Sequence, residues 1–385
     1  MAPHRPQAGS YLSVMCALLS FAAAAETKPL VIAHRGASGY LPEHTLAAKV
    51  YAHALGADFL EQDLVLTKDD VPVVLHDIYL DTVSDVAARF PDRKRADGRY
   101  YALDLTLAEL KTLRVAERFN AKTGAPVYPL RYPSATAPAE FRISTLEEEL
   151  QAIQGLNRST GRNAGIYPEI KQPKWHRDQG RDITRIVLPI LERFGYATRE
   201  APCFLQCFEL TELKRIRGEL GWKGRTIMLL NARGKEHDGV DHDRLCTAEG
   251  IRELAQIVDG IGPAFGRIVT WPAAGAAPKF TALVAQAHAA RLAVHPYTIR
   301  RDELPKNCPS VDALHAALFR DAGIDGVFTD FTDVTAFGAD RSSIGPSVKR
   351  AAATMNIALS PDPDRESPSL WCIPPRSIGV GKHCS

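Results

Sequence analysis

Short apolar runs alternate with longer amphipathic segments along most of the chain. Eight of the runs have the length and composition of buried strands and cover residues 30–34, 58–63, 165–170, 203–208, 225–230, 258–262, 291–296 and 326–330. Helical spacing of apolar residues marks the segments between them, namely 44–54, 145–156, 182–194, 209–219, 248–258, 279–290 and 311–322. Because continuous apolar strands that alternate with helices are typical of parallel sheets, the pattern predicts an α/β fold, a TIM (β/α)8 barrel.

The connection between the second and third predicted strands is far longer than the others. Roughly 100 residues lie there, where one helix and two loops need far fewer. Residues 64–76 have the pattern of a hairpin with Lys68-Asp69-Asp70 at its turn. Residues 78–144 are polar and aromatic but carry several leucines. This favours a small folded insertion over one mouth of the barrel, with a disordered loop as the alternative.

The two ends of the chain differ from the predicted barrel in composition. Residues 1–25 contain an apolar stretch that ends in Ala23-Ala24-Ala25, the pattern of a cleaved secretory signal. The alternative is a membrane anchor, but the run is shorter than the roughly 20 residues that span a bilayer. The chain is therefore expected to be periplasmic or secreted, with the barrel domain at 26–340. Residues 341–385 are rich in proline, serine and charge and predict an irregular tail.

The composition of the chain gives no indication of binding to nucleic acid or to a charged membrane. The net charge is +2, with 45% hydrophobic and 24% charged residues, so nothing favours nucleic acid or an anionic membrane surface. Six of the seven cysteines remain after the predicted signal is removed. Cys203 and Cys207 lie four apart on a predicted strand, roughly 13 Å at strand rise, beyond the reach of a disulfide. We expect both to be packing residues, whereas Cys372 and Cys384 in the tail could pair. The oligomeric state is not indicated.

Polar and reactive residues stand where the predicted strands end. In barrels of this class the site is built at the C-terminal ends of the strands. The residues concerned are His34, Arg35, Glu61, Asp63, His76, Glu169, Lys171, Gln206, His295, Tyr297 and Asp330. The sequence therefore predicts one shared site at that mouth of the barrel.

Three of these residues are acids on neighbouring strands. Glu61 and Asp63 are alternate residues of one strand and share a face, and Glu169 belongs to the next barrel strand. Converging carboxylates repel and raise one another's pKa, and a divalent cation removes that cost. Oxygen ligands favour Ca²⁺, or Mg²⁺, over Zn²⁺. The alternative is a buried salt network with Arg35 and Lys171.

Histidines accompany the acids. His34 and His76 are candidates for a general acid and a general base, because their ordinary pKa is near neutrality; the alternative is an inert core role. His295 is either a core residue or a substrate contact. His44 follows Pro42-Glu43 and is expected only to cap a helix or contact the loop. Glu43 could be a further metal ligand or support one.

Basic residues complete the set. Arg35 can bind a phosphate with two hydrogen bonds, and Lys171 supplies a point charge. Gln206 and Tyr297 are further candidates for substrate binding. Metal, histidines and phosphate-binding cations together indicate phosphoryl chemistry.

The motifs at these positions resemble the glycerophosphodiester phosphodiesterase family. They are H-R-G-A-S-G-Y-L-P-E-H-T at 34–45, G-A-D-F-L-E-Q-D-L-V-L-T-K-D-D at 56–70 and V-V-L-H-D at 73–77, followed in order by Y-P-E-I-K, L-Q-C-F, D-G-I-G-P, V-H-P-Y-T-I-R and F-T-D-F. The resemblance covers about residues 28–338. With its signal and insertion the chain is similar to the periplasmic bacterial branch. Residues 231–246 and 263–277 follow no pattern of the family.

The resemblance implies a TIM-type barrel that hydrolyses glycerophosphodiesters to sn-glycerol 3-phosphate and an alcohol. It implies Ca²⁺, or Mg²⁺ in some members, on Glu61, Asp63 and Glu169, with His34 and His76 as the acid–base pair. It likewise implies that Arg35 and Lys171 hold the phosphate. Expected substrates are glycerophosphocholine and glycerophosphoethanolamine.

The expected mechanism is internal attack by the glycerol 2-hydroxyl through a cyclic 1,2-phosphate. Two alternatives stand beside this function. One is a phosphatidylinositol-type phospholipase C, which would need an exposed apolar rim. The other is a secreted binding protein on an inactive barrel.

Overall fold

The computed structural model describes residues 28–132 and 140–342. The predicted signal at 1–25, the paired-cysteine prediction for Cys372 and Cys384, and nearly all of the tail at 341–385 lie outside the described residues. These three predictions stay predictions.

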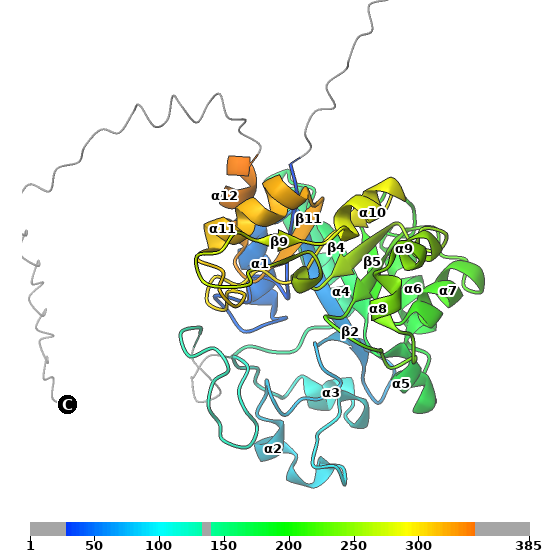
Figure 1. Cartoon of the computed structure of the whole chain (residues 1–385). Coiled ribbons are helices and arrows are strands. Elements are labelled where there is room, and N and C mark those ends of the chain that lie inside the picture. Colours follow the sequence, from blue (N-terminus) through cyan, green and yellow to red (C-terminus); the bar gives the residue numbers. More distant parts are fainter. Residues whose placement is uncertain (1–27, 133–139, 343–385) are drawn as a thin grey trace, which may run out of the picture. The chain divides into compact units, whose positions relative to one another are not determined.

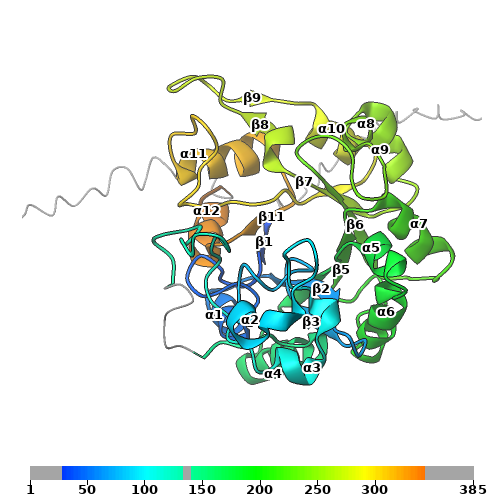
Figure 2. The ribbon, with the colours of Figure 1, turned by 90° about the horizontal axis from the view of Figure 1, so that it is seen from below.

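Eight parallel strands form the centre of the molecule. They are β1 (Leu30–Ala33), β2 (Phe59–Leu66), β4 (Gly165–Ile170), β5 (Phe204–Cys207), β6 (Arg225–Leu230), β7 (Gly260–Pro263), β10 (Ala293–Val294) and β11 (Gly326–Thr329). Their order in the sheet is β10-β7-β6-β5-β4-β2-β1-β11, with every neighbouring pair parallel. Viewed along the strands, they form a ring with the helices outside it (Figure 2).

The ring closes between its two end strands. The amide nitrogen of Asp325 donates to the carbonyl oxygen of Val294 at 3.1 Å, and that of Phe328 to the oxygen of Pro296 at 3.0 Å. The nitrogen of Ile299 in turn donates to the oxygen of Phe328 at 2.8 Å. The segment after β10 thus pairs with β11, and the predicted TIM barrel is confirmed.

Helices cover the outside of the barrel (Figure 1). They are α1 (Leu46–Ala54), α4 (Leu146–Thr160), α5 (Pro173–Asp178), α6 (Ile183–Arg193), α7 (Leu210–Gly218), α8 (His242–Leu245), α9 (Ala248–Leu254), α10 (Leu283–Ala289), α11 (Val311–His315), the π-helix η4 (Ala316–Ala322) and α12 (Thr332–Ser342). Capping side chains set several starts: Thr45 begins α1, Thr145 forms a capping box with Glu148, and Ser310 begins α11. Within the described ranges no helix combines the length and apolar character that a bilayer crossing requires.

One predicted helix begins later than expected. The helical spacing predicts a helix over residues 279–290, but α10 starts at Leu283. Lys279–Phe280 form β9, which pairs with β8 (Val269–Thr270). The 3₁₀ turn η3 (Phe265–Arg267) precedes this ribbon. Local hydrogen bonding between two strands has outweighed the helical spacing there.

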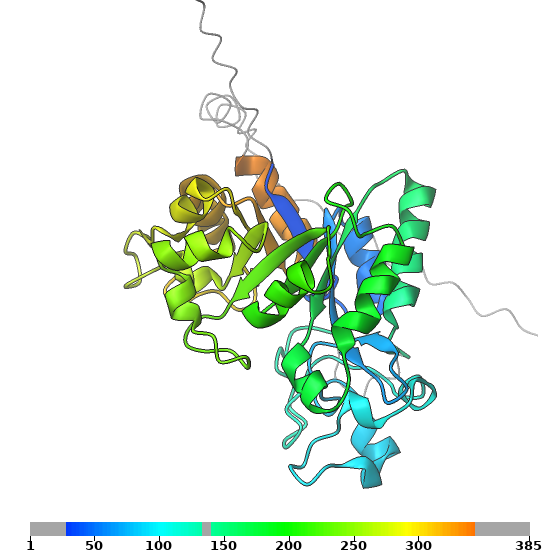
Figure 3. The same ribbon diagram turned by 90° about the vertical axis from the view of Figure 1, so that its right-hand side faces the viewer.

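The long connection after β2 begins with the predicted hairpin. β3 (Pro72–Val74) pairs antiparallel with the end of β2. The next 70 or so residues hold the short elements α2 (Val86–Arg89), η1 (Pro91–Arg93), η2 (Ala102–Asp104) and α3 (Leu107–Leu110). They pack around their own apolar cluster, which includes Leu80, Leu105, Leu110 and Leu113. Figures 1 and 3 show this insertion at one end of the barrel, below the rest.

Candidate active site

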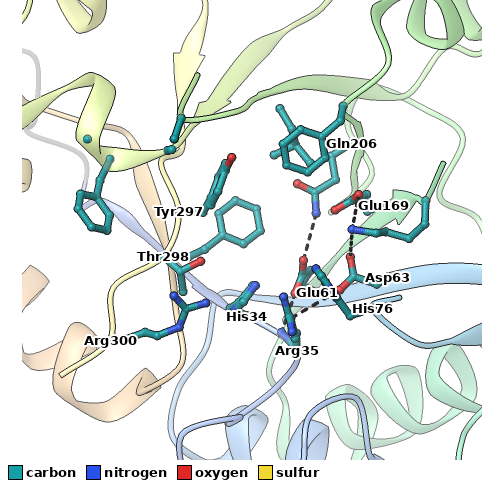
Figure 4. Close-up of a pocket in the computed structure, with 18 residues that line it drawn as sticks. His34, Arg35, Glu61, Asp63, His76, Glu169, Gln206, Tyr297, Thr298 and Arg300 are labelled. Atoms are coloured by element: carbon teal, nitrogen blue, oxygen red, sulfur yellow. Dashed lines mark hydrogen bonds and ion pairs between the residues drawn. The ribbon is translucent and has the colours of Figure 1, made fainter. Parts of the chain in front are cut away.

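A cavity of about 400 Å³ lies at the C-terminal ends of the barrel strands. Nine of the eleven residues predicted for the site line it: His34, Arg35, Glu61, Asp63, His76, Glu169, Gln206 and Tyr297, which Figure 4 labels, and Lys171. Asp330 lines a smaller adjoining cavity instead, and His295 lines neither. Apolar and small side chains form much of the remaining wall, including Phe208, Phe265 and Phe328. Ala232 and residues 264–266 also line the cavity, so the segments that follow no family pattern reach the site.

Strand register brings the acids together. Glu61 and Asp63 lie on β2, and the parallel pairing sets Asp63 opposite Glu169 of β4, which is opposite Gln206 of β5. The tight turn after β1 places Arg35 next to them. Its backbone is left-handed at φ 57°, and its amide nitrogen donates to Oε2 of Glu61 at 2.6 Å. Three strands and one strained turn therefore converge on the carboxylates.

The buried acids perturb one another. Burial raises the pKa of Glu61 well above its usual value, and the Asp63 and Glu169 charges raise it further. Burial also raises the pKa of Glu169 to about 8, against the opposing charge of Lys171. Burial acts in the same direction on Asp63, but Lys171 and His76 outweigh it and hold the pKa of Asp63 well below its usual range. A positive charge bound between these oxygens would relieve the repulsion.

A cation fits the donor set. Oδ1 of Asp63 is buried and has no hydrogen-bond partner among the described residues, and unpaired buried oxygens are costly. The salt network raised as an alternative is also present. Nζ of Lys171 lies 2.8 Å from Oε1 of Glu169 and 3.6 Å from Oδ1 of Asp63, and Nε of Arg35 lies 3.8 Å from Oδ2 of Asp63. A metal ion and the salt network would use the same carboxylate oxygens. When ionised, these carboxylates carry the charge that a divalent ion requires.

His44 has a role that its sequence position did not indicate. Thr45, not His44, caps α1, so the expected capping role is wrong. Nε2 of His44 lies 2.7 Å from Oδ2 of Asp63, and its ring is close enough to Glu61 and Asp63 for the three to form a candidate metal cluster.

The contact with Lys49 indicates whether His44 is a metal ligand or supports one. Its Nζ lies 3.3 Å from Nδ1 of His44 and 3.1 Å from Oε2 of Glu149, and it also donates to the carbonyl oxygen of Glu61. A lysine ammonium has three donors and no acceptor, so Nδ1 of His44 accepts and the ring proton is on Nε2. His44 therefore donates a hydrogen bond to Asp63 and orients that carboxylate. This role is that of a residue that supports a metal ligand and not that of a ligand itself.

Lys49 is expected to contribute strongly to folding stability. It is fully buried, and its replacement by methionine leaves the carboxylate of Glu149 without its ion pair. Losing one partner of a buried pair costs about 3–5 kcal/mol, so Lys49→Met should lower the free energy of unfolding by that order in urea titrations. Lys174→Met removes an exposed pair with Asp178 and should cost about 0.5 kcal/mol or less. Equal effects of the two substitutions would contradict the buried-pair account.

Each candidate catalytic histidine is held by a carboxylate. Nδ1 of His34 lies 2.6 Å from Oδ1 of Asp330, and Nδ1 of His76 lies 2.7 Å from Oδ1 of Asp77. These bonds fix the rings and leave Nε2 of each histidine for a substrate. Burial, and then the charge of Arg35, lowers the pKa of both histidines to about 4. The inert-core alternative is not supported, because both rings line the cavity.

The other candidates take different places. His295 is a core residue: it is buried, its Nδ1 lies 2.8 Å from the hydroxyl of Tyr167, and it packs edge-on against Phe204. Glu43 accepts from Nη1 of Arg35 at 2.9 Å. Burial opposes its ionisation, but Arg118 and Arg35 hold the pKa of Glu43 far below its usual value. Glu43 is therefore an anchor for arginine rather than a member of the carboxylate cluster.

Gln206 and Tyr297 line the cavity through different contacts. Nε2 of Gln206 donates to Oε1 of Glu61 at 3.4 Å, so it touches the carboxylate cluster. The hydroxyl of Tyr297 donates to the carbonyl oxygen of Leu230 at 3.1 Å. Substrate binding by either side chain stays a prediction.

The four cysteines that the structure describes form no disulfide. Cys203, Cys207 and Cys308 are buried and free, and Cys246 is half-buried and free. The prediction that Cys203 and Cys207 do not bridge is confirmed.

Sequence comparison connects this site to known proteins. Residues 34–334 match the model of the "Glycerophosphoryl diester phosphodiesterase family". The chain is 42% identical over 323 residues to a glycerophosphodiester phosphodiesterase of Haemophilus influenzae, covering 79% of this chain and 88% of that protein. It is 37% identical over 324 residues to one of Treponema pallidum, covering 79% and 90%.

Solved structures share the fold at lower identity. A putative glycerophosphoryl diester phosphodiesterase from Silicibacter pomeroyi superposes with a TM-score of 0.60 at 23% identity, covering 82% of this chain and 95% of that one. A phosphodiesterase from Oleispira antarctica, solved with the product sn-glycerol-3-phosphate, gives a TM-score of 0.54 at 21% identity, with 81% and 97% covered.

Proposed function

Because the chain belongs to the glycerophosphoryl diester phosphodiesterase family and is itself a glycerophosphodiester phosphodiesterase, we propose that it works by metal-assisted acid–base catalysis with His34 and His76. The observation that carries the proposal is the cavity in which both carboxylate-held histidines face a buried carboxylate cluster. Membership of an enzyme family, with the predicted residues all present, speaks against an inactive binding protein.

We assign the metal to Glu61, Asp63 and Glu169, with His44 supporting Asp63. The Asp63 oxygen that lacks a hydrogen bond, the mutual repulsion of the acids and their hard-donor chemistry suit Ca²⁺, with Mg²⁺ as the second choice. When bound, such an ion polarises a phosphoryl oxygen as a Lewis acid. Arg35 and Lys171, which border the same oxygens, would hold the phosphate.

The glycerol supplies the nucleophile in this proposal. One histidine removes the proton of the glycerol 2-hydroxyl, whose oxygen attacks phosphorus, while the other protonates the departing alcohol. The product is a glycerol cyclic 1,2-phosphate, which water opens to sn-glycerol 3-phosphate with the two roles reversed. Internal attack benefits from the high effective molarity of a tethered hydroxyl.

The histidine environments suit these roles once substrate is present. With a pKa of about 4, both rings are neutral near pH 7, so the base is ready to accept a proton. The acid must gain one. A phosphodiester anion beside the ring favours protonation, and the carboxylate on Nδ1 stabilises the imidazolium.

Deacylated phospholipids are the proposed substrates, with glycerophosphocholine and glycerophosphoethanolamine first. The Oleispira antarctica phosphodiesterase binds sn-glycerol-3-phosphate as its product, which supports the same product here. Action in the periplasm or outside the cell rests on the composition of residues 1–25 and stays a prediction.

We expect glycerophosphocholine to be hydrolysed and its 2-deoxy analogue to be inert. The 2-hydroxyl is the internal nucleophile, so its removal leaves no route to the cyclic phosphate. Time-resolved ³¹P NMR on the Ca²⁺-loaded enzyme should show the cyclic phosphate before sn-glycerol 3-phosphate. The analogue should still compete with glycerophosphocholine, because its phosphate and alcohol are intact. Turnover of the analogue at the normal rate would refute internal attack while leaving the diesterase activity in place.

A further inference from the structure

Two arginines of the insertion reach the carboxylates that hold the histidines. Nη2 of Arg131 donates to Oδ2 of Asp330 at 2.8 Å, and Nη1 of Arg118 donates to Oδ2 of Asp77 at 2.7 Å. In each case the other carboxylate oxygen bonds a histidine, at 2.6 Å for His34 and 2.7 Å for His76. Each carboxylate is thus held at both oxygens, by a histidine and by an arginine of the insertion.

Arg131 is held firmly. Its side chain is only 4% exposed. It bonds both oxygens of Asp302 at 2.8 and 3.0 Å, and its guanidinium lies 3.7 Å from the ring centre of Tyr128. A bidentate pair and a stacked ring leave a guanidinium little freedom.

Arg118 also forms a bidentate pair, and it connects to the phosphate side of the site. Its Nη2 and Nε donate to the two oxygens of Glu43 at 2.6 and 3.2 Å. The same Glu43 accepts from Nη1 of Arg35 at 2.9 Å. Glu43 therefore links the insertion to the arginine proposed to bind phosphate.

The histidines stand between the barrel and the insertion. A second cavity of about 220 Å³ shares His34, Arg35 and His76 with the main one. Its other walls include Arg118, Tyr128 and Arg131 of the insertion. The barrel supplies the histidines and the walls of the main cavity. The insertion supplies walls of the second cavity, on the other side of the histidines.

We propose that Arg118 and Arg131 are positioning residues for the reaction: through Asp77 and Asp330 they set the orientation of His76 and His34. The inference rests on the proposed function, because it assumes that these histidines carry the protons. An arginine on the free oxygen fixes the plane of each carboxylate and so the ring that it holds. The insertion is then part of the catalytic apparatus and not only a cover.

The two arginines are not equally important in this arrangement. Asp330 also accepts from Nε of Arg300 at 2.8 Å, so it keeps one arginine when Arg131 is lost. Among the described residues, Arg118 is the only arginine on Asp77. We therefore expect substitution of Arg118 to have the larger effect.

The test compares Arg118→Gln, Arg131→Gln and the control Arg114→Gln in the Ca²⁺-loaded enzyme with glycerophosphocholine. Arg114 belongs to the same insertion, is half exposed and pairs with Asp85 at the surface. Arg118→Gln should lower kcat about 10- to 100-fold with little change in KM, and Arg118→Lys should restore part of it. Arg131→Gln should lower kcat by less than Arg118→Gln does, and the control Arg114→Gln should leave kcat unchanged. The Nδ1 proton resonance of His76, identified by its absence in His76→Ala, should move in Arg118→Gln only.

A double-substitution cycle separates positioning from a general structural role. If Arg118 acts mainly through Asp77, adding Arg118→Gln to Asp77→Asn should lower kcat by much less than Arg118→Gln does in the wild-type protein. Additive losses, or an unchanged kcat and His76 resonance in folded Arg118→Gln, would overturn the inference. If Arg118→Gln does not fold, Asp77→Asn takes its place. Asp77→Asn must then lose the Nδ1 proton resonance of His76 and have a lower kcat, and failure of either result would overturn the inference. Loss of activity in His76→Ala combined with full activity in Arg118→Gln would sink the positioning role and leave the proposed function intact.

Discussion

Replacing His34 or His76 by alanine is expected to lower kcat for glycerophosphocholine by about 10²- to 10⁴-fold, the contribution of a well-placed general acid or base. Both rings line the cavity and are already fixed through Nδ1, so their loss removes a proton carrier without removing a metal ligand or a phosphate contact. KM should therefore change little. Steady-state kinetics with the control His288→Ala, an exposed histidine paired with Asp325, measures the difference.

A substrate with a good leaving group tells the two histidines apart. A p-nitrophenyl diester of glycerol 3-phosphate needs no proton on its departing oxygen. The variant that has lost the first-step acid should therefore release p-nitrophenol almost normally, and the variant that has lost the base should not. Retained turnover of glycerophosphocholine in both alanine variants would refute the assigned roles. Equal losses with both substrates in both variants would mean that neither histidine is the first-step acid.

Neutralising Glu61 is expected to abolish Ca²⁺ binding and turnover together while making the metal-free protein more stable. Folding raises the pKa of some buried carboxyls above the unfolded-state value. Such a group lowers the free energy of unfolding as pH rises from the unfolded-state pKa to the folded-state pKa, because the folded protein resists its ionisation. Glu61 is such a group, through burial and the charges of Asp63 and Glu169. Glu61→Gln removes that cost and also removes a ligand.

Thermal melts and calorimetry on the same samples measure both effects. Ca²⁺ should raise the Tm of the wild-type protein, since a ligand that binds only the folded state stabilises it, and it should not raise that of Glu61→Gln. The metal-free variant should melt above the metal-free wild type. A control, Glu253→Gln, removes a surface carboxylate paired with Lys214 and should leave the response to Ca²⁺ intact. A variant that still binds Ca²⁺ at wild-type affinity would exclude Glu61 as a ligand.

Local sequence pattern was enough to predict the barrel and nine of the residues that line its main cavity. Apolar runs mark buried strands whatever surrounds them, and a barrel of parallel strands sends their polar C-terminal residues to one mouth. The helix predicted from residue 279 begins at Leu283, because pairing of β8 with β9 is not visible in helical spacing. The sequence position of His44 does not indicate its role for a similar reason, since that role depends on where Lys49 and Asp63 lie.

The partners of the histidines depend on contacts too distant in sequence for a pattern to show. Arg131 and Asp330 are 199 positions apart, and His34 and Asp330 are 296 apart. The sequence marks Asp330 only as a polar residue at a strand end, and Arg118 and Arg131 lie in a segment with no regular spacing. Such residues become recognisable only when the fold brings them together.

The pairing of β1 with β11 gives the enzyme a built-in dependence on chain completion. His34 follows the first strand and Asp330 the last, so the pair forms only when the final strand has joined the ring. A nascent or truncated chain that stops before β11 lacks this dyad, whatever its earlier strands do. Recovery of activity during refolding should therefore follow closure of the barrel seam and not the earlier collapse of its core.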